Sequence, residues 1–290
     1  MIDLHTHTNK SDGQYTPSEV VTMAAARGIS ILAITDHDTV SGLAEGEARA
    51  AELRITFVPA IEISVEGNRD LHILGYYIDY ADASLLQLCE NFMYLRTQRE
   101  GRIFNYLRAY GVAPSEEQVK RYVTQGTAGR PHFARAMVEA GYAATVQDAF
   151  DRYLGTPEFD AIERSKPPAR DGIEAIMKAG GVPVLAHPAL LKLNDKCLDA
   201  LLYELSEYGL AGMECYYSMH SGEQTSRYLE LAHKHGLLVT CGSDFHGEQT
   251  KPGVELGDGS RGLKEQNIQD ILSGLKSCYE KNLRQAEQPR

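Results

Sequence analysis

Short apolar runs alternate with helix-forming segments through the first part of the chain. The runs predict four β-strands, at residues 2–7, 30–37, 55–64 and 71–78. Between the first two, Thr16, Pro17 and Glu19 form the pattern of a helix N-terminus, and the helix is expected to reach about Arg27. An Ala- and Glu-rich segment predicts a second helix that ends near Leu53. The link between the third and fourth strands is too short for a crossover helix, so these strands are expected to form a hairpin.

The pattern becomes helical between about residues 79 and 180, where no convincing strand is found. Residues 83–111 predict one long helix or two, and shorter helices are expected around residues 116–124, 130–140 and 145–153. Residues 166–170, with two prolines, predict a linker that leaves this section. Strands then return at residues 182–187, 212–217 and 237–246, and helices at residues 195–208 and 222–235 and at the C-terminus.

Seven strands in such an alternation predict an α/β fold, interrupted by an all-helical insert. The predicted domains are an α/β domain of residues 1–79 and 169–290 and an insert of residues 80–168. Without the insert, the length is near the lower end for an α/β barrel. A doubly wound open sheet is the competing architecture. Neither GxGxxG nor GxxxxGK[ST] follows the first strand, which weakens a nucleotide-cofactor interpretation.

Composition and charge narrow the classes of partner. The chain has 290 residues, of which 43% are hydrophobic, and its formal net charge is −11. This charge argues against binding to the phosphate backbone of duplex nucleic acid. It leaves a small phosphorylated substrate open, because bound metal ions can reverse the sign of the local charge.

Cysteine usage and apolar runs indicate the compartment. No apolar run approaches the roughly 18 residues of a membrane span, and the start of the sequence lacks the pattern of a secretory signal. The five cysteines are widely spread and contain no CxxC pair, so neither a disulfide framework nor a thiolate zinc site is expected. We therefore expect a cytoplasmic protein without a membrane partner, and the oligomeric state is left open.

Imidazole and carboxylate side chains gather at the ends of the predicted strands. His5 and His7 are two apart on a strand and therefore point to one face. The others lie at or inside the six later strand segments, namely Asp36, His37, Asp38, Glu62, His72, His187, Glu214, His220, Asp244 and His246. The carboxyl ends of parallel strands form the functional face of α/β folds, so most of these side chains are expected to meet there. His72 begins its strand, and it joins them only if the hairpin brings it beside Glu62.

Each residue taken singly has a structural alternative. Asp36 or Asp38 can cap the helix after the second strand, His187 can be a buried core histidine, and Asp244 can be a turn residue after Gly242. Taken together, these alternatives require almost every strand to end in His, Asp or Glu by accident. A metal site is therefore favoured, and nitrogen and oxygen ligands without thiolate suit Zn, Mn or Fe.

The motifs HTH, TDHD, HILGY, AHP and GSDFH, in this order, resemble those of the PHP (polymerase and histidinol phosphatase) family over the whole chain. The insert, with GRPHFARAMVEAGY and AFDRYLG, is similar to the bacterial small-molecule branch of that family. The resemblance implies a distorted seven-stranded (β/α)7 TIM-like barrel whose helical insert covers the active site. It also implies a centre of three divalent metal ions, with Mn favoured over Fe or Zn.

Nine residues match the ligand positions of the family. The resemblance implies that the first ion is held by His5, His7, Glu62 and Asp244. Glu62 would bridge to a second ion, which is also bound by His72 and His187. The third ion would be held by Asp12, His37 and His246.

The activity implied by the resemblance is phosphoric ester hydrolysis, in which hydroxide supplied by the ions attacks phosphorus. Asp244 and His220 are the candidate catalytic residues, as proton donors to the leaving group. Arg130 and His132 open a helix of the insert, where a guanidinium and a helix N-terminus suit a second phosphate, and His220 is a further candidate substrate contact. The alternative is that Arg130 lies on the surface and His132 packs.

The expected substrate is a nucleoside 3′,5′-bisphosphate or a similar bisphosphorylated nucleotide or sugar. The alternative within the family is a cyclic phosphodiesterase that opens a five-membered cyclic sugar phosphate, such as phosphoribosyl 1,2-cyclic phosphate, and then releases phosphate. An amidohydrolase and a non-catalytic structural module are the alternatives of other classes. Residues 155–170 depart from the stretch expected from the family, so the exact substrate stays open.

Overall fold

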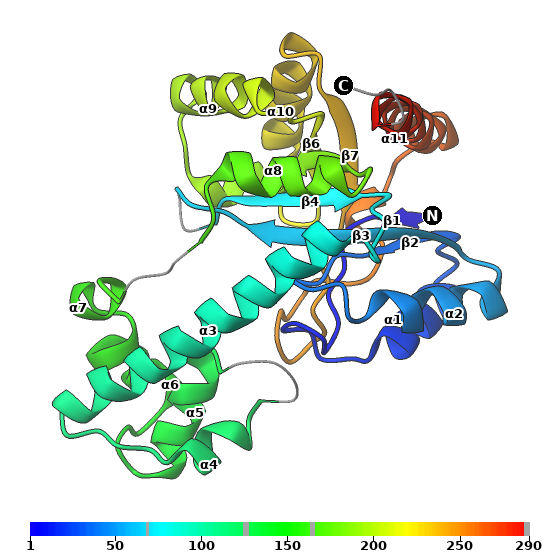
Figure 1. Cartoon of the computed structure of the whole chain (residues 1–290). Coiled ribbons are helices and arrows are strands. Elements are labelled where there is room, and N and C mark those ends of the chain that lie inside the picture. Colours follow the sequence, from blue (N-terminus) through cyan, green and yellow to red (C-terminus); the bar gives the residue numbers. More distant parts are fainter. Residues whose placement is uncertain (68–69, 124–127, 163–165, 287–290) are drawn as a thin grey trace. The chain divides into compact units, whose positions relative to one another are not determined.

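The computed structural model describes residues 1–67, 70–123, 128–162 and 166–286 and separates into two compact units. The first unit comprises Met1–Cys89 and Lys166–Arg290, and the second comprises Glu90–Ser165. Helix α3 (Ala83–Ala109) begins in the first unit and continues into the second (Figure 1). We describe each unit by itself.

The first unit is built on one seven-stranded sheet with the strand order β1-β2-β3-β4-β5-β6-β7. The strands are β1 (Ile2–Asp3), β2 (Ile31–Ile34), β3 (Thr56–Ser64), β4 (His72–Tyr76), β5 (Val182–Leu185), β6 (Gly212–Tyr217) and β7 (Leu238–Gly242). The helices around this sheet are α1 (Pro17–Ala26), α2 (Leu43–Leu53), α8 (Ala169–Lys178), α9 (Asp195–Glu207), α10 (Gly222–Lys234) and α11 (Glu265–Ala286) (Figure 1). Two 3-10 turns complete it, η2 (Pro188–Leu191) and η3 (Asp258–Ser260).

Strand direction is parallel except at β4. This strand runs antiparallel to both β3 and β5, and Ser64 pairs with His72 across the β3–β4 hairpin. The start of β4 therefore lies beside the end of β3, as the short link predicts. An antiparallel strand thus places its first residue, His72, at the edge where the parallel strands end.

The segments that follow β1 and β7 bring the two edges of the sheet together. The Asp244 N–H donates to the His5 carbonyl at 2.8 Å, and the His7 N–H donates to the Phe245 carbonyl at 2.8 Å. Thr6 also forms an isolated parallel bridge with Phe245. The seven-stranded sheet is thus nearly closed into a barrel, which confirms the predicted α/β barrel and excludes the open doubly wound sheet.

Local sequence explains the helix that follows β1. Thr16 Oγ1 accepts a hydrogen bond from the Glu19 N–H at 3.3 Å, and Glu19 Oε2 accepts one from the Thr16 N–H at 2.8 Å. Pro17 occupies the first turn, where its missing N–H costs nothing. This capping box confirms the predicted start of α1.

Helix α8 was not predicted. It begins at Ala169, inside residues 166–170, where the prolines predict a linker. Ile173 and Ile176 are buried, and a Cβ added to Gly75 of β4 would meet Ile176 Cγ1 at 2.8 Å. Burial of this apolar face against the sheet outweighs the linker-like composition.

The described part of the second unit is entirely helical. Besides the continuation of α3, it contains α4 (Glu116–Lys120), α5 (Arg130–Glu139), α6 (Val146–Ala149), the π-helical turn η1 (Phe150–Leu154) and α7 (Pro157–Asp160). Residues 83–109 thus form one helix rather than two, and residue 124, the predicted end of the next helix, lies outside the described residues. The unit has its own apolar core, which includes Leu107, Phe133, Leu154 and Phe159.

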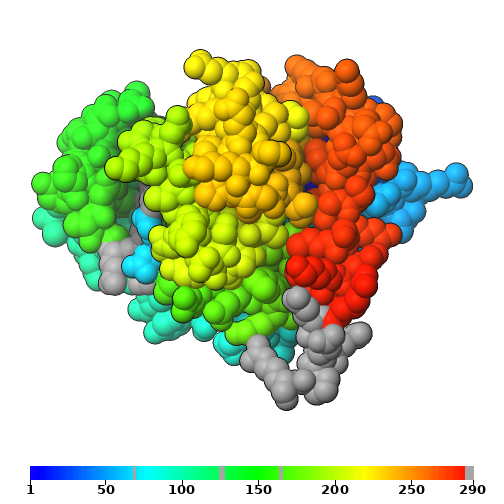
Figure 2. All heavy atoms as spheres, turned by 90° about the horizontal axis from the view of Figure 1, so that it is seen from above, coloured from blue at the N-terminus to red at the C-terminus, as the bar shows by residue number. Residues whose placement is uncertain are grey.

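Helices α9, α10 and α11 form a large part of the surface of the first unit in the view from above, coloured yellow-green, yellow and red (Figure 2). None of the helices in the described parts of the chain is both long enough and apolar enough to cross a membrane.

Candidate functional site

All nine residues at the predicted ligand positions lie in one cluster of the first unit. They fall into four overlapping groups, and within each group the potential ligand atoms all lie within 4.8 Å of one another. The groups are His7, Asp12, His37 and His246; His5, His7 and Asp244; His5, Glu62 and His187; and His37, Glu62 and His72.

Glu62 occupies the centre of the cluster, surrounded by five imidazoles. Its Oε1 lies 2.9 Å from His72 Nδ1 and 2.8 Å from His187 Nε2. Its Oε2 lies 3.3 Å from His5 Nε2, 3.1 Å from His7 Nε2 and 3.1 Å from His37 Nδ1. A single buried carboxylate therefore connects most of the donors.

The other two carboxylates, Asp244 and Asp12, lie near opposite ring nitrogens of His246. Asp244 Oδ1 lies 3.3 Å from His7 Nε2 and 3.3 Å from His246 Nδ1. Asp12 Oδ1 lies 3.2 Å from His246 Nε2, and Asp12 Oδ2 lies 3.8 Å from His37 Nε2. Asp12, which comes from the loop after β1, thus joins the strand-end residues.

One of the three predicted ligand sets lies wholly within one group, and a second does so except for Glu62. Asp12, His37 and His246 share a group, and His5, His7 and Asp244 share another, with Glu62 Oε2 beside it. The third set, Glu62, His72 and His187, is divided between two groups, although Glu62 Oε1 contacts both imidazoles.

The loop between His7 and Asp12 is fixed by Asp36. Asp36 accepts hydrogen bonds from the Thr8 N–H at 2.8 Å, the Thr8 hydroxyl at 2.6 Å and the Ser11 hydroxyl at 2.6 Å. Gly13 completes the turn, because a Cβ there would lie 2.5 Å from the His7 carbonyl oxygen. Asp36 is therefore a loop-positioning residue, not a helix cap.

Glu214 of β6 orients two of the donors, His5 and His187, through atoms that do not face the cluster. Its Oε1 lies 3.0 Å from His5 Nδ1, and its Oε2 accepts the His187 N–H at 2.8 Å. A carboxylate on Nδ1 favours a proton there, which leaves the Nε2 lone pair of His5 directed at the cluster. The position of Glu214 inside a predicted strand does not by itself indicate this role.

Two cluster residues have left-handed backbone. The backbone angle φ is 27° at His187 and 57° at Asp244. In this region the backbone conformation is unfavourable for residues other than glycine. Each lies two residues after the end of a strand, β5 or β7, so this conformation occurs where the chain leaves the regular ladder and enters the cluster.

The neighbouring charges favour ionised carboxylates. Burial alone would raise the pKa of Glu62, but His37, His5 and His72 outweigh it and hold that pKa well below its usual range. Burial is likewise outweighed at Asp244 by His5 and His246, which lower its pKa well below the usual range.

The carboxylates act in the opposite direction on the histidines. Burial would lower the pKa of His7, but Asp244 and Glu62 outweigh it and raise that pKa to about 10. His37 differs, because burial dominates and lowers its pKa to about 3. The buried carboxylates therefore favour positive charge at the centre of the cluster.

The donor set fits divalent cations. His5 Nε2 and His7 Nε2 lie only 3.2 Å apart and both face the carboxylates. His7 Nδ1 and His187 Nδ1 are buried without a hydrogen-bond partner in the described part of the chain. Six imidazoles and three carboxylates without thiolate are ligands that Mn²⁺, Fe²⁺ or Zn²⁺ accept.

The two candidate proton donors lie in different surroundings. Asp244 is part of the cluster, and Tyr217 OH donates to its Oδ2 at 2.8 Å. His220 lies outside the four groups, with Nδ1 3.0 Å from the Cys215 carbonyl oxygen and its ring between Tyr217 and Tyr228. Burial lowers the pKa of His220, so it is neutral with Nδ1 protonated.

Arg130 and His132 belong to the second unit. Arg130 is only 12% exposed, with Nη1 3.8 Å from Asp160 Oδ1 and its guanidinium over the Phe150 ring. His132 Nδ1 accepts the Gly129 N–H at 2.9 Å, so it closes the first turn of α5.

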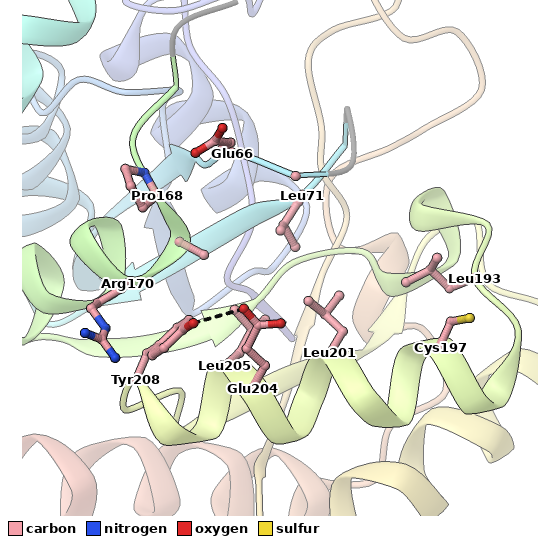
Figure 3. Close-up of a pocket in the computed structure, with 12 residues that line it drawn as sticks. Glu66, Leu71, Pro168, Arg170, Leu193, Cys197, Leu201, Glu204, Leu205 and Tyr208 are labelled. Carbon is pink, nitrogen blue, oxygen red and sulfur yellow. Dashed lines mark hydrogen bonds between the residues drawn. The ribbon is translucent and has the colours of Figure 1, made fainter.

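A cavity of about 420 Å³ in the first unit lies away from this chemistry. Figure 3 shows apolar side chains from Leu71, Leu201 and Leu205 along it, and Tyr208 donating to Glu204. None of the nine cluster residues lines it, so the donor cluster remains the candidate functional site.

A sequence profile described as "PHP domain" matches residues 3–282. A 3′,5′-nucleoside bisphosphate phosphatase of Chromobacterium violaceum is 34% identical and covers 84% of this chain and 87% of its own. A 5′-3′ exoribonuclease of Escherichia coli, named Rnm, is 33% identical and covers 88% and 87%. A phosphoribosyl 1,2-cyclic phosphate 1,2-diphosphodiesterase of Eggerthella lenta is 31% identical and covers 85% and 94%.

Solved structures agree with the fold. One from Chromobacterium violaceum, described as an amidohydrolase with bound sulfate and no metal, has a TM-score of 0.77 at 33% identity and covers 88% of this chain and 90% of its own. One from Bifidobacterium adolescentis, described as a metal-dependent phosphoesterase, has a TM-score of 0.75 at 31% identity and covers 94% and 96%.

Proposed function

The chain belongs to the PHP family and is a metal-dependent phosphoesterase, and from that premise we propose that it removes phosphate from a small bisphosphorylated metabolite. A nucleoside 3′,5′-bisphosphate, or a similar bisphosphorylated nucleotide or sugar, is the favoured substrate. The observation that carries the proposal is the convergence of nine donors around the buried Glu62. We infer a cytoplasmic enzyme that acts on small molecules and not on duplex nucleic acid.

Three divalent ions, with Mn²⁺ favoured, are proposed for the cluster. The proposed ligand sets are His5, His7, Glu62 and Asp244; Glu62, His72 and His187; and Asp12, His37 and His246. When bound, such ions supply activated water at neutral pH and offset the negative charge of a phosphoryl group.

The chain's own residues orient the donors and hold the protons. Glu214 keeps a proton on His5 Nδ1 and so directs Nε2 toward the cluster. Asp244 is ionised, and His220 is neutral with its Nδ1–H on the Cys215 carbonyl oxygen. We keep both as the proposed groups that exchange a proton with the leaving group.

Two relatives suggest further candidate substrates, and the ligand positions bear on whether the chain is catalytic. The diphosphodiesterase relative supports a cyclic sugar phosphate as the second candidate substrate. The relative named as a 5′-3′ exoribonuclease adds RNA to the candidate substrates. A non-catalytic module is disfavoured because every one of the nine ligand positions holds an imidazole or a carboxylate.

The substrate proposal is tested by phosphate release. The Mn²⁺-loaded protein would be assayed with adenosine 3′,5′-bisphosphate, a five-membered cyclic sugar phosphate and adenosine 5′-monophosphate. We expect kcat/KM to be highest for the bisphosphate. A higher kcat/KM for the cyclic ester would replace this substrate with the cyclic one, and equal values for the bisphosphate and the monophosphate would contradict a second-phosphate preference.

The proposed substrate contacts Arg130 and His132 are tested by mutation in the same assay. Arg130→Ala is expected to reduce kcat/KM for the bisphosphate far more than for the monophosphate, because only the bisphosphate carries a second phosphate for the guanidinium. Arg135→Ala, an exposed arginine of the same helix α5, is the matched control. Equal losses with both substrates would remove Arg130 from the binding site.

A further inference from the structure

Lys251 lies beside the donor cluster, in the loop after β7, and no sequence motif pointed to it. Its Nζ contacts Asp244 Oδ2 and donates to the Tyr217 hydroxyl oxygen at 2.9 Å. Tyr217 OH in turn donates to the same Asp244 Oδ2 at 2.8 Å. An ammonium, a phenol and one carboxylate oxygen therefore form a closed triangle.

Asp244 connects this triangle to the cluster through its other oxygen. Oδ1 lies 3.5 Å from His5 Nε2 and 3.3 Å from His7 Nε2, while Oδ2 faces Tyr217 and Lys251. The Lys251 side chain is 22% exposed, whereas that of Asp244 is 6% exposed. The positive charge thus lies directly beside Asp244, itself a proposed ligand, at a position that a solute can reach.

Two of the three N–H groups of the Lys251 ammonium have a hydrogen-bond acceptor, which leaves one N–H to account for. A lysine carries three N–H donors, and two of them serve Asp244 and Tyr217. In the described part of the chain, no acceptor is recorded for the third. An anionic oxygen at the edge of the cluster would satisfy this donor and match its charge.

We propose that Lys251 is a substrate-binding residue whose third N–H donates to a phosphoryl oxygen of the ester. This inference rests on the proposed function, because it names the protein group that receives a phosphoryl oxygen at that site. No proton is transferred. The Lys251 ammonium stabilises the charge of the phosphoryl group and keeps Asp244 Oδ1 directed at the cluster.

Inorganic phosphate, the reaction product, is the probe for this contact. Phosphate would be titrated calorimetrically into the Mn²⁺-saturated wild type and Lys251→Met, and bound metal would be counted by mass spectrometry. We expect Lys251→Met to keep the metal content of the wild type and to bind phosphate at least about tenfold more weakly, because a charge-assisted hydrogen bond is lost. Lys251→Arg is expected to recover part of this affinity.

Two further variants distinguish direct binding of phosphate by Lys251 from an indirect effect through Asp244. Lys276→Met removes an exposed lysine of α11 and is expected to bind phosphate like the wild type. Tyr217→Phe removes one support of Asp244 but keeps the ammonium, so its phosphate affinity is expected to fall much less than that of Lys251→Met.

The proposed contact is contradicted if Lys251→Met binds phosphate with an affinity within about twofold of the wild type. Loss of one hydrogen bond to a charged group would lower the affinity by more than that. The contact is also overturned if Tyr217→Phe weakens phosphate as much as Lys251→Met, since the lysine would then act through Asp244 alone. A wild type that binds no phosphate overturns it as well. Failure of the proposed function is seen separately, as a wild type that binds phosphate but releases none from the three esters.

Discussion

Glu214 illustrates, at the scale of single residues, how the donors depend on groups that bind no ligand themselves. It holds His5 Nδ1 at 3.0 Å and the His187 N–H at 2.8 Å, and all three residues are buried. The Gln side chain has the same shape but offers one acceptor oxygen and an NH₂ donor. One of the two contacts is therefore lost in Glu214→Gln.

Glu214→Gln is expected to lower metal affinity about 10- to 100-fold, as loss of a hydrogen bond behind a ligating histidine typically does. Competition with a fluorescent chelator measures this affinity. Glu204→Gln, at an exposed position on α9, serves as the control and should bind metal normally. Unchanged affinity in Glu214→Gln would mean that His5 needs no such support.

Proton release on metal binding follows from the pKa of His7. Asp244 and Glu62 outweigh the effect of burial and raise that pKa to about 10, so the His7 imidazole is positively charged at neutral pH. A metal ion at Nε2 displaces the proton, and affinity must then rise with pH throughout the range below about 10. His37, whose pKa is lowered to about 3, is already neutral and adds nothing to this slope.

We expect apparent Mn²⁺ affinity to increase by up to about tenfold per pH unit between about pH 6 and 8 for each proton released. Calorimetry in buffers of different ionisation enthalpy counts these protons directly. A pH-independent affinity with no proton release would contradict the charge state assigned to His7.

At the scale of elements, the contact between the 3-10 turn η3 and the end of β7 holds the backbone beneath the donors. A Cβ added to Gly259 would lie 1.9 Å from the Gly242 carbonyl oxygen, and one added to Gly242 would lie 2.2 Å from His5 Cβ. The backbones of η3 and of the end of β7 are therefore in contact, with no room for a side chain, just before Asp244. Substitution at Gly259 must therefore move one of these segments.

Gly259→Ala is expected to lower the free energy of unfolding by at least about 2 kcal/mol, because the added methyl meets backbone that cannot rotate away. Gly222→Ala, at the start of α10 where a Cβ meets nothing within 4 Å, should change it by less than about 0.5 kcal/mol. Urea unfolding of the two variants checks the contrast. Similar values for both would show that η3 can shift without cost.

The elements show how far the sequence determines the fold. Alternation of apolar runs identified all seven strands, and the short link correctly indicated the hairpin that carries His72. The regular part of β1 is only Ile2–Asp3, although Thr6 beyond it still accepts the Thr35 N–H at 2.8 Å on one side and bridges to Phe245 on the other. Helix α8 was missed because tertiary burial of Ile173 and Ile176 decides it, and no local signal records that burial.

The same limit applies to the site. The spacing of His5 and His7 and the strand-end acids and histidines pointed to a cluster, because strand ends converge in any α/β barrel. Tyr217 and Lys251 gave no such signal, since an aromatic in a strand and a lysine in a loop are ordinary there. Their relation to Asp244 arises only when β6 and β7 lie side by side.

At the scale of the whole molecule, metal binding should stabilise one unit and not the other. The nine donors come from segments at the ends of six strands of the first unit, so ions held by them would connect those segments. The second unit has an apolar core of its own and contributes none of the donors. A single site at 100 times its Kd would add about 2.7 kcal/mol to the stability of the first unit.

Hydrogen exchange with and without a chelator tests this difference. Removal of metal is expected to speed exchange in β3 and in the segments that follow β1 and β7, and to leave α5 unchanged. Re-addition of Mn²⁺ should restore protection. Equal acceleration in α5 would show that the two units are stabilised together.

The nine donors around Glu62 are proposed to form a metal centre. Anomalous diffraction at the manganese absorption edge, from crystals of the Mn²⁺-loaded protein, locates the ions without assuming their ligands. We expect anomalous peaks within the cluster, one of them shared by Glu62 and lost in crystals of Glu62→Gln. Peaks found only outside the cluster, or none in fully loaded crystals, would contradict it.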